Sequence, residues 1–226
     1  MNPRWPVLAG LAALCLGLAA LLMTRSDEPP VQPFRYDRSR PLDISREKVG
    51  APIAGVQLER VTFSSSDGER VPATLLSPAA PPSDPQACLI FMNGYGTNSA
   101  DSVGSLAPIA LAGVPVLVLD ARLNGTREPR PGARAASIRT GTSAAAVLRA
   151  SVVDVRRAID VLGTDGTCDP SRIGVVGVSQ GAIIMTMVAA TDPRVAASVL
   201  LMPSPDARAA RTALRRIQPG ALEDLA

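Results

Sequence analysis

The sequence predicts an α/β fold whose sheet is mostly parallel and flanked by helices. From residue 87 onward, short apolar runs typical of buried strands alternate four times with segments of helical periodicity. That order is typical of parallel strands joined by crossover helices. Polar residues and glycines follow directly after these runs, at the carboxyl ends of the strands, where such sheets carry their ligand sites.

The chain divides into three predicted parts, and the first, residues 1–23, is apolar. Residues 6–23 carry no charge, follow Arg4 and are just long enough to span a bilayer. We expect a signal anchor that crosses the cell membrane once and leaves the domain exported. The alternative is a signal peptide cleaved near residues 19–20, which would give a secreted or periplasmic domain.

The second and third parts are a tether and a globular domain. Residues 24–56 are rich in proline, arginine and aspartate and predict a tether rather than packed structure. The domain is expected over residues 57–226. It begins with two short apolar runs that flank residues 66–69, a Ser-Asp-Gly-Glu sequence typical of a β-hairpin turn.

The remaining elements are predicted from apolar spacing. Continuous apolar runs predict buried strands at residues 87–96, 115–125, 172–179 and 195–203. Helical spacing predicts helices at residues 99–114, 143–166 and 180–192, and in the tail after residue 204 up to Pro219.

The charge pattern argues against nucleic-acid binding. The formal net charge is +3, aromatic residues make up 3% of the chain, and the arginines are dispersed rather than clustered. A nucleic-acid site needs a basic patch, often with aromatic side chains on which bases stack. The oligomeric state stays open.

Residues 177–181 read Gly-Val-Ser-Gln-Gly, the G-x-S-x-G pattern of a nucleophile elbow. The motif follows a predicted strand and opens a predicted helix, which is the context that an elbow requires. Gly177 and Gly181 have no Cβ, so the strand and the helix can pass close together while the turn lifts the Ser179 hydroxyl out of the sheet. The alternative is an ordinary turn in which the serine caps the helix.

The helix after Ser179 predicts where negative charge would be stabilised. Its first amides point toward the serine, and its dipole favours an anion there. The oxyanion of an acyl-transfer intermediate needs two such donors. We expect them to be the backbone N–H groups of Gln180 and of Tyr95, the latter in the segment FMNGYG.

From about residue 61 to residue 206 the chain resembles the α/β-hydrolase superfamily, in particular its dienelactone hydrolase, acetyl xylan esterase and prolyl oligopeptidase branch. The segments VTFSSSDGERVPATLLSP, LIFMNGYG, LVLDARLNG and DPSRIGVVGVSQGA carry the likeness. It implies a serine esterase with Ser179 as nucleophile, the Tyr95 and Gln180 amides as oxyanion hole, a small-molecule ester as substrate, and no metal or organic cofactor. The family often has histidine where this chain has Asn93, a departure that removes a side chain which helps to shape the loop.

The composition conflicts with the implied mechanism, because the chain contains no histidine. In the resembled family the catalytic acid and histidine follow the serine, on loops after two further strands. We therefore expect a C-terminally truncated chain that lacks the last two strands and both triad partners, and that is inactive or nearly so. The alternative is a non-catalytic binding or scaffold protein that has kept the fold.

Other ionisable residues are not assigned to catalysis. Asp120 is expected to order a loop together with Arg122, and Asp206 to cap the helical tail. A carboxylate alone is a weak base toward a serine hydroxyl. Lys48, the only lysine of the chain, lies in the predicted tether.

The resemblance also places two cysteines on neighbouring strands. Cys88 starts one apolar run, and Cys168 lies four residues before another. A disulfide between them is geometrically possible in an exported domain. Two unlinked cysteines are the alternative, and the sequence alone favours them.

Overall fold

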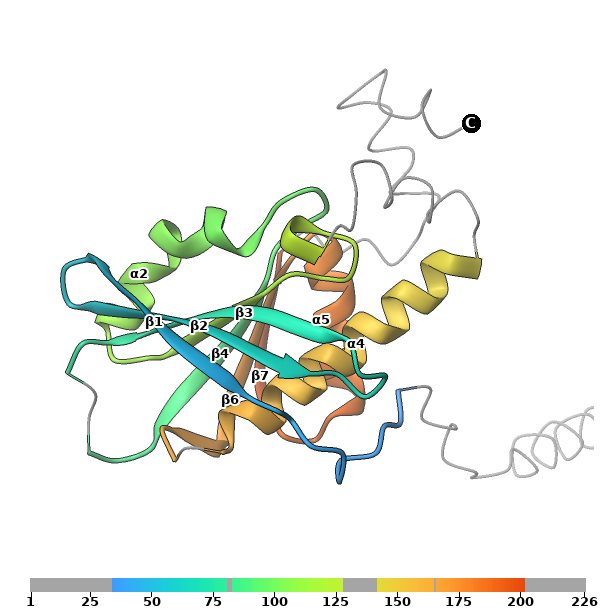
Figure 1. Cartoon of the computed structure of the whole chain (residues 1–226), viewed down its shortest axis with the longest axis horizontal. Coiled ribbons are helices and arrows are strands. Elements are labelled where there is room, and N and C mark those ends of the chain that lie inside the picture. The colour runs from blue at the N-terminus through green and yellow to red at the C-terminus, as the bar shows by residue number, and fades with distance from the viewer. Residues whose placement is uncertain (1–33, 81–82, 128–141, 165, 202–226) are drawn as a thin grey trace, which may run out of the picture. The chain divides into compact units, whose positions relative to one another are not determined.

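The computed structural model describes residues 34–80, 83–127, 142–164 and 166–201, which contain one seven-stranded sheet (Figure 1). The strand order is β1-β2-β3-β5-β4-β6-β7. The strands are β1 (Ser45–Ile53), β2 (Val56–Ser64), β3 (Arg70–Pro78), β4 (Gln86–Met92), β5 (Val116–Leu119), β6 (Cys168–Val178) and β7 (Val195–Leu201). The helices are η1 (Ser99–Ser102), α2 (Val103–Leu111), η2 (Gly125–Arg127), α4 (Thr142–Leu162) and α5 (Gln180–Thr191).

The predicted hairpin is present. β2 and β3 pair antiparallel along their whole length. The turn closes through the Ser65 N–H, which donates to the Glu69 carbonyl at 2.8 Å, and the Gly68 N–H, which donates to the Ser65 carbonyl at 3.1 Å. Gly68 has a φ of +86°, in the left-handed region that favours glycine, which explains the Asp-Gly pair at this turn.

The folded domain begins earlier than the sequence predicts. β1 pairs antiparallel with β2, and the compact unit starts at Phe34. The described residues 34–56 therefore belong to the domain and not to the predicted tether. The strand was not predicted because β1 carries three successive charges, Arg46, Glu47 and Lys48. Charges and register irregularities are typical of the edge of a sheet, where they discourage pairing with other chains.

The sheet is mixed rather than mostly parallel. β5, β4, β6 and β7 pair in parallel, as the alternation of strands and helices predicts. β1, β2 and β3 pair antiparallel with one another, and β3 pairs antiparallel with β5. The prediction of a mostly parallel sheet was wrong, because the N-terminal hairpin joins the same sheet and pairs antiparallel. The parallel half carries the candidate site, since β4, β5 and β6 end at the same edge.

Helices cover both faces of the sheet (Figure 1). Val155 of α4 and Ile184 of α5 belong to one buried cluster, on one face, and Leu106 of α2 belongs to another, on the opposite face. β7 is the second edge of the described sheet, and its Val199 and Leu201 side chains are 52% and 49% exposed. The two described edges therefore differ, one being charged and the other apolar.

A polar network fastens the start of the described chain to the helices. The Arg156 guanidinium on α4 donates to the Phe34 carbonyl at 2.7 Å and to the Asp192 carboxylate at 3.0 Å. The Tyr36 hydroxyl donates to the Asp160 carboxylate, also on α4, at 2.9 Å. Because Asp192 directly follows α5, the network joins the N-terminal segment to both helices on this face.

Asp192 is expected to make the fold sensitive to acid. Burial alone would raise its pKa, but hydrogen bonds from Arg194 and Arg156 outweigh that effect and hold the pKa at about 2, below the ordinary 3.8. The pairing then stabilises the fold fully above pH 3.8, and about 2 kcal/mol is lost as the pH falls toward 2. In urea unfolding, the difference in unfolding free energy between wild type and Asp192→Asn should stay constant above pH 5 and shrink below pH 4. A difference that is independent of pH would contradict this assignment.

No helix within the described ranges is long and apolar enough to cross a membrane. The predicted membrane or signal segment at residues 6–23 lies outside the described residues, as do Asp206 and the predicted helical tail. The absence of two further strands stays a prediction.

Candidate active site

Ser179 lies at a sharp turn between β6 and α5, where the motif predicts an elbow. Its backbone has a φ of +52° and a ψ of −113°, a conformation that side chains other than glycine rarely adopt. The Ser179 N–H donates to the Leu201 carbonyl at 2.8 Å, and the Ile183 N–H donates to the Ser179 carbonyl at 3.2 Å. Ser179 is exposed and stands at the N-cap position of α5, but its side chain makes no capping hydrogen bond. The surrounding structure thus holds a strained residue in an exposed position.

The two elbow glycines lie where backbones nearly touch. A Cβ on Gly177 would come within 2.5 Å of the Gly181 backbone, and a Cβ on Gly181 would come within 2.2 Å of the Met92 carbonyl oxygen. Real Cβ atoms do not approach other atoms so closely. Glycine at both positions therefore lets α5 pass close to β6 and to the end of β4.

The loop after β4 passes directly beside the serine. A Cβ on Gly94 would lie 3.2 Å from the Ser179 Cβ and 3.8 Å from its Oγ. Tyr95 is the next residue, and its side chain is 47% exposed. The structure thus brings the loop with the predicted donor Tyr95 next to Ser179, and Gln180, the next residue after Ser179, opens α5.

Asn93 takes part in shaping this loop. Its Nδ2 donates to the Asn98 carbonyl at 3.1 Å and to the Ser102 hydroxyl. The asparagine therefore makes loop contacts of its own at the position where the resembled family often has histidine. The amide ties the end of β4 to η1, five to nine residues further along.

Asp120 orders the loop after β5. Its Oδ2 accepts hydrogen bonds from the Thr126 N–H at 3.2 Å and from the Thr126 hydroxyl at 3.1 Å. Burial raises the pKa of Asp120, although these hydrogen bonds oppose the shift. The loop-ordering role of Asp120 agrees with the prediction. The predicted partner Arg122 is wrong, because Arg122 pairs with Asp154.

Arg122 belongs to a buried ionic cluster behind the loop. Its guanidinium makes two hydrogen bonds of 3.0 Å to the Asp154 carboxylate, one to each oxygen. Arg127 contacts the same carboxylate at 2.9 Å, and Asp154 is fully buried on α4. Burial alone would lower the pKa of Arg122, but hydrogen bonds to Asp154 and Asp67 outweigh it and raise that pKa. The cluster fixes the loop after β5 to α4 and to the β2–β3 turn.

Asn124 is a site residue that the sequence did not single out. It is 2% exposed, and its side chain bonds to both Gly96 and Gln180. The one sequence signal was its place in an Asn-Gly pair just after a strand that ends at the site edge. That signal indicates a turn and not a contact.

The site has a candidate nucleophile and candidate oxyanion donors, but no histidine is present in the sequence to act as base. Among the described residues, no group of three or more histidine, cysteine, aspartate or glutamate side chains could hold a metal ion. The arrangement can therefore hold a hydroxyl beside backbone amides, while proton removal from Ser179 needs a further group.

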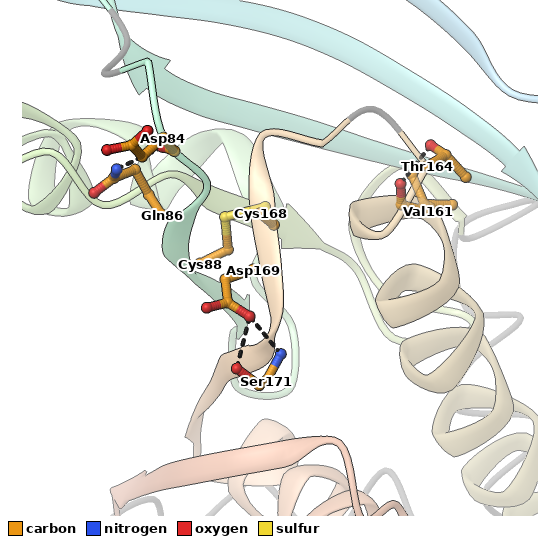
Figure 2. The surroundings of a disulfide bond; sticks show 8 residues. All are labelled: Asp84, Gln86, Cys88, Val161, Thr164, Cys168, Asp169 and Ser171. Carbon is orange, nitrogen blue, oxygen red and sulfur yellow. Dashed lines mark hydrogen bonds between the residues drawn. A yellow bond between two sulfur atoms is a disulfide. The ribbon is translucent and has the colours of Figure 1, made fainter.

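The cysteines on β4 and β6 form a disulfide, Cys88–Cys168, with a Cα–Cα distance of 5.6 Å (Figure 2). The alternative of unlinked cysteines is therefore wrong. The bond bridges a register shift between the two strands, near their amino ends. Beside it, the Asp169 carboxylate accepts hydrogen bonds from the Ser171 N–H at 2.9 Å and hydroxyl at 2.6 Å, which shapes the irregular start of β6 (Figure 2).

Solved structures share this fold at low sequence identity. The chain is 21% identical to an acetyl xylan esterase from Paenibacillus sp. R4, with a TM-score of 0.62 over 82% of this chain and 66% of that one. Acetyl xylan esterase 1 from a Thermoanaerobacterium species is 20% identical, with a TM-score of 0.58 over 86% of this chain and 67% of that one. An α/β hydrolase from a Penicillium species is 20% identical, with a TM-score of 0.52 over 71% of this chain and 52% of that one. The chain thus spans about two thirds of the first two proteins and half of the third, and the likeness establishes the α/β-hydrolase fold.

No curated protein sequence matches the chain. The acetyl xylan esterase (AXE1) family does match, over residues 34–205, which begins at the first described residue and includes the elbow, the loop after β4 and the disulfide. This match covers most of the 226 residues. The chain belongs to the acetyl xylan esterase family.

Proposed function

We propose that the chain carries the nucleophile and the oxyanion hole of a serine hydrolase that acts on carboxylic esters. The observation that supports this most is the strained, exposed Ser179 with the Gly94 backbone packed against its side chain. Such strain is costly and persists where surrounding structure holds it, as at active sites. A serine that only closed a turn would not need it.

The proposed reaction follows from the position of each group. The Ser179 Oγ attacks the ester carbonyl carbon while a base takes its proton, and the N–H groups of Tyr95 and Gln180 donate to the oxyanion that forms. The bond to the alcohol breaks, the alcohol leaves with the proton, and water then hydrolyses the acyl-serine. Because the sequence holds no histidine, we propose that the 226 residues alone turn over slowly.

For the substrate we propose an acetyl ester of a carbohydrate such as xylan. The family match and the names of two structural relatives support this class. A comparison of acetylated xylan with p-nitrophenyl acetate and p-nitrophenyl butyrate would test it. Faster release from the butyrate would contradict an acetyl preference.

The missing base suggests a chemical test with imidazole. We expect hydrolysis of p-nitrophenyl acetate by the full chain to rise with imidazole concentration by about tenfold, a small part of what a built-in base contributes. Ser179→Ala should show only the background rate of imidazole itself. Ser171→Ala is the matched control, since this exposed serine lies on β6, eight residues before Ser179, and should behave as wild type.

Equal rates for wild type and Ser179→Ala at every imidazole concentration would overturn the proposal. If, in addition, a fluorophosphonate left no adduct on Ser179, the result would support the alternative of a non-catalytic binding or scaffold protein. The absence of histidine from the sequence is the observation that favours this alternative.

We also propose that the domain is exported, either anchored through residues 6–23 or released. Disulfides persist in oxidising compartments, so the Cys88–Cys168 bond supports export. The apolar run at residues 6–23 supports a targeting segment. Fractionation of cells that express the full chain would test this, and recovery in the cytosol would contradict it.

A further inference from the structure

We propose that Asn124 is a positioning residue that fixes the two donors of the candidate oxyanion hole relative to each other. This inference rests on the proposed function. The Gly96 N–H donates to the Asn124 Oδ1 at 3.4 Å, and the Asn124 Nδ2 donates to the Gln180 Oε1 at 2.7 Å. Gly96 directly follows Tyr95, the first donor, and Gln180 supplies the second. One buried side chain therefore bridges the two segments from which the donors come.

The bridge matters because the two donor segments belong to different elements. The loop after β4 and the first residue of α5 lie more than eighty residues apart in the sequence. Two N–H groups stabilise an oxyanion only if both point at the place where it forms. A displacement of about 1 Å can cost up to about a hundredfold in rate, so a link between the segments acts directly on catalysis.

The backbone of Asn124 is itself held by hydrogen bonds, as a positioning residue requires. Its N–H donates to the Ala121 carbonyl at 3.1 Å, and its carbonyl accepts from the Arg127 N–H at 2.9 Å. The Asp120 carboxylate fixes the next turn of the loop through Thr126. The backbone of Asn124 is therefore fixed. The side-chain hydrogen bonds to Gly96 and Gln180 then fix the two segments that carry the donors.

The chemistry of the side chain explains why an amide serves here. A neutral amide offers an acceptor and donors at the same end of a short side chain. In Asn124→Asp the carboxylate could still accept from the Gly96 N–H, and it could also accept from the Gln180 Nε2 if the Gln180 amide turned over. Asn124→Leu removes the acceptor and the donors together, so neither hydrogen bond can re-form.

The first test is kinetic and uses the full chain in imidazole. Asn124→Leu should lower the Ser179-dependent kcat for p-nitrophenyl acetate about tenfold and leave KM within about twofold, because the donors act on the transition state. A merely structural role would lower the amount of folded protein and the apparent stability, without this split between kcat and KM.

The second test is independent of turnover. Hydrogen–deuterium exchange, measured by mass spectrometry, should become faster in peptides covering residues 93–97 and 179–183 of Asn124→Leu, while the β2–β3 hairpin stays as in wild type. Asn98→Asp is the control, because it also replaces an asparagine amide, on the neighbouring loop, and keeps its hydrogen bond. Its Oδ1 accepts from the Asp101 N–H at 3.1 Å, and a carboxylate can accept the same bond.

The outcomes separate the two proposals. Wild-type kinetics and wild-type exchange in Asn124→Leu would overturn the role of Asn124 and leave the proposed function standing. A wild-type chain without any Ser179-dependent rate would overturn the proposed function. The hydrogen–deuterium exchange would then decide whether Asn124 links the two segments. Faster exchange in both segments of Asn124→Leu but not of Asn98→Asp supports the bridge, and unchanged exchange in Asn124→Leu refutes it.

Discussion

Replacement of Asp154 by alanine is expected to lower the free energy of unfolding by about 3–5 kcal/mol, because it leaves buried charges without their partner. The Asp154 side chain is fully buried between Arg122 and Arg127, whose side chains are 12% and 2% exposed. It also accepts a hydrogen bond from the Ser65 hydroxyl. Without the carboxylate, two guanidinium groups would remain inside the domain with less than their full pairing.

Asp67→Ala is the matched control for this prediction. Asp67 pairs with the same Arg122, but its side chain is 51% exposed, so its removal should cost less than about 1 kcal/mol. Urea unfolding of the two variants beside wild type measures the difference. Equal losses would show that burial of the carboxylate is not what makes the cluster stabilising.

Loss of the Cys88–Cys168 disulfide is expected to cost about 4 kcal/mol, because the bond closes a loop with a sequence separation of 80 residues in the unfolded chain. The measurement is urea unfolding of wild type and of the double variant Cys88→Ala with Cys168→Ala, each with and without a reductant. Wild type should lose stability when reduced, and the double variant should not respond to the reductant.

The disulfide prediction also has a functional side. The bond lies near the amino ends of β4 and β6, whereas Ser179 follows the carboxyl end of β6. The Ser179-dependent rate of the folded double variant should therefore match that of wild type. Identical unfolding of the oxidised wild type and the double variant would contradict the stabilising role.

The elbow could be predicted from sequence because its determinants are local. Gly177, Ser179 and Gly181 lie within five residues, between an apolar run and an apolar helix, and the structure places the turn at Ser179. The hairpin was predictable for the same reason, since an Asp-Gly pair between two apolar runs specifies its own turn.

Features that depend on distant partners could not be predicted in this way. β1 carries three successive charges that indicate a solvated segment, and it is a strand only because β2 offers it a partner. Asn124 gains its importance from Gly96 and Gln180, which lie 28 and 56 residues away. Periodicity and motifs describe neighbours along the chain and contain no record of such contacts.

The disulfide has a further consequence for the covalent integrity of the domain. Its two cysteines enclose α2, β5 and α4 in one closed loop of the chain. A protease that cut anywhere between Tyr95 and Cys168 would produce two fragments, one with Tyr95 and the other with Ser179 and Gln180. The bond would keep these fragments in one molecule, so a nicked chain would retain both halves of the candidate oxyanion hole until it was reduced.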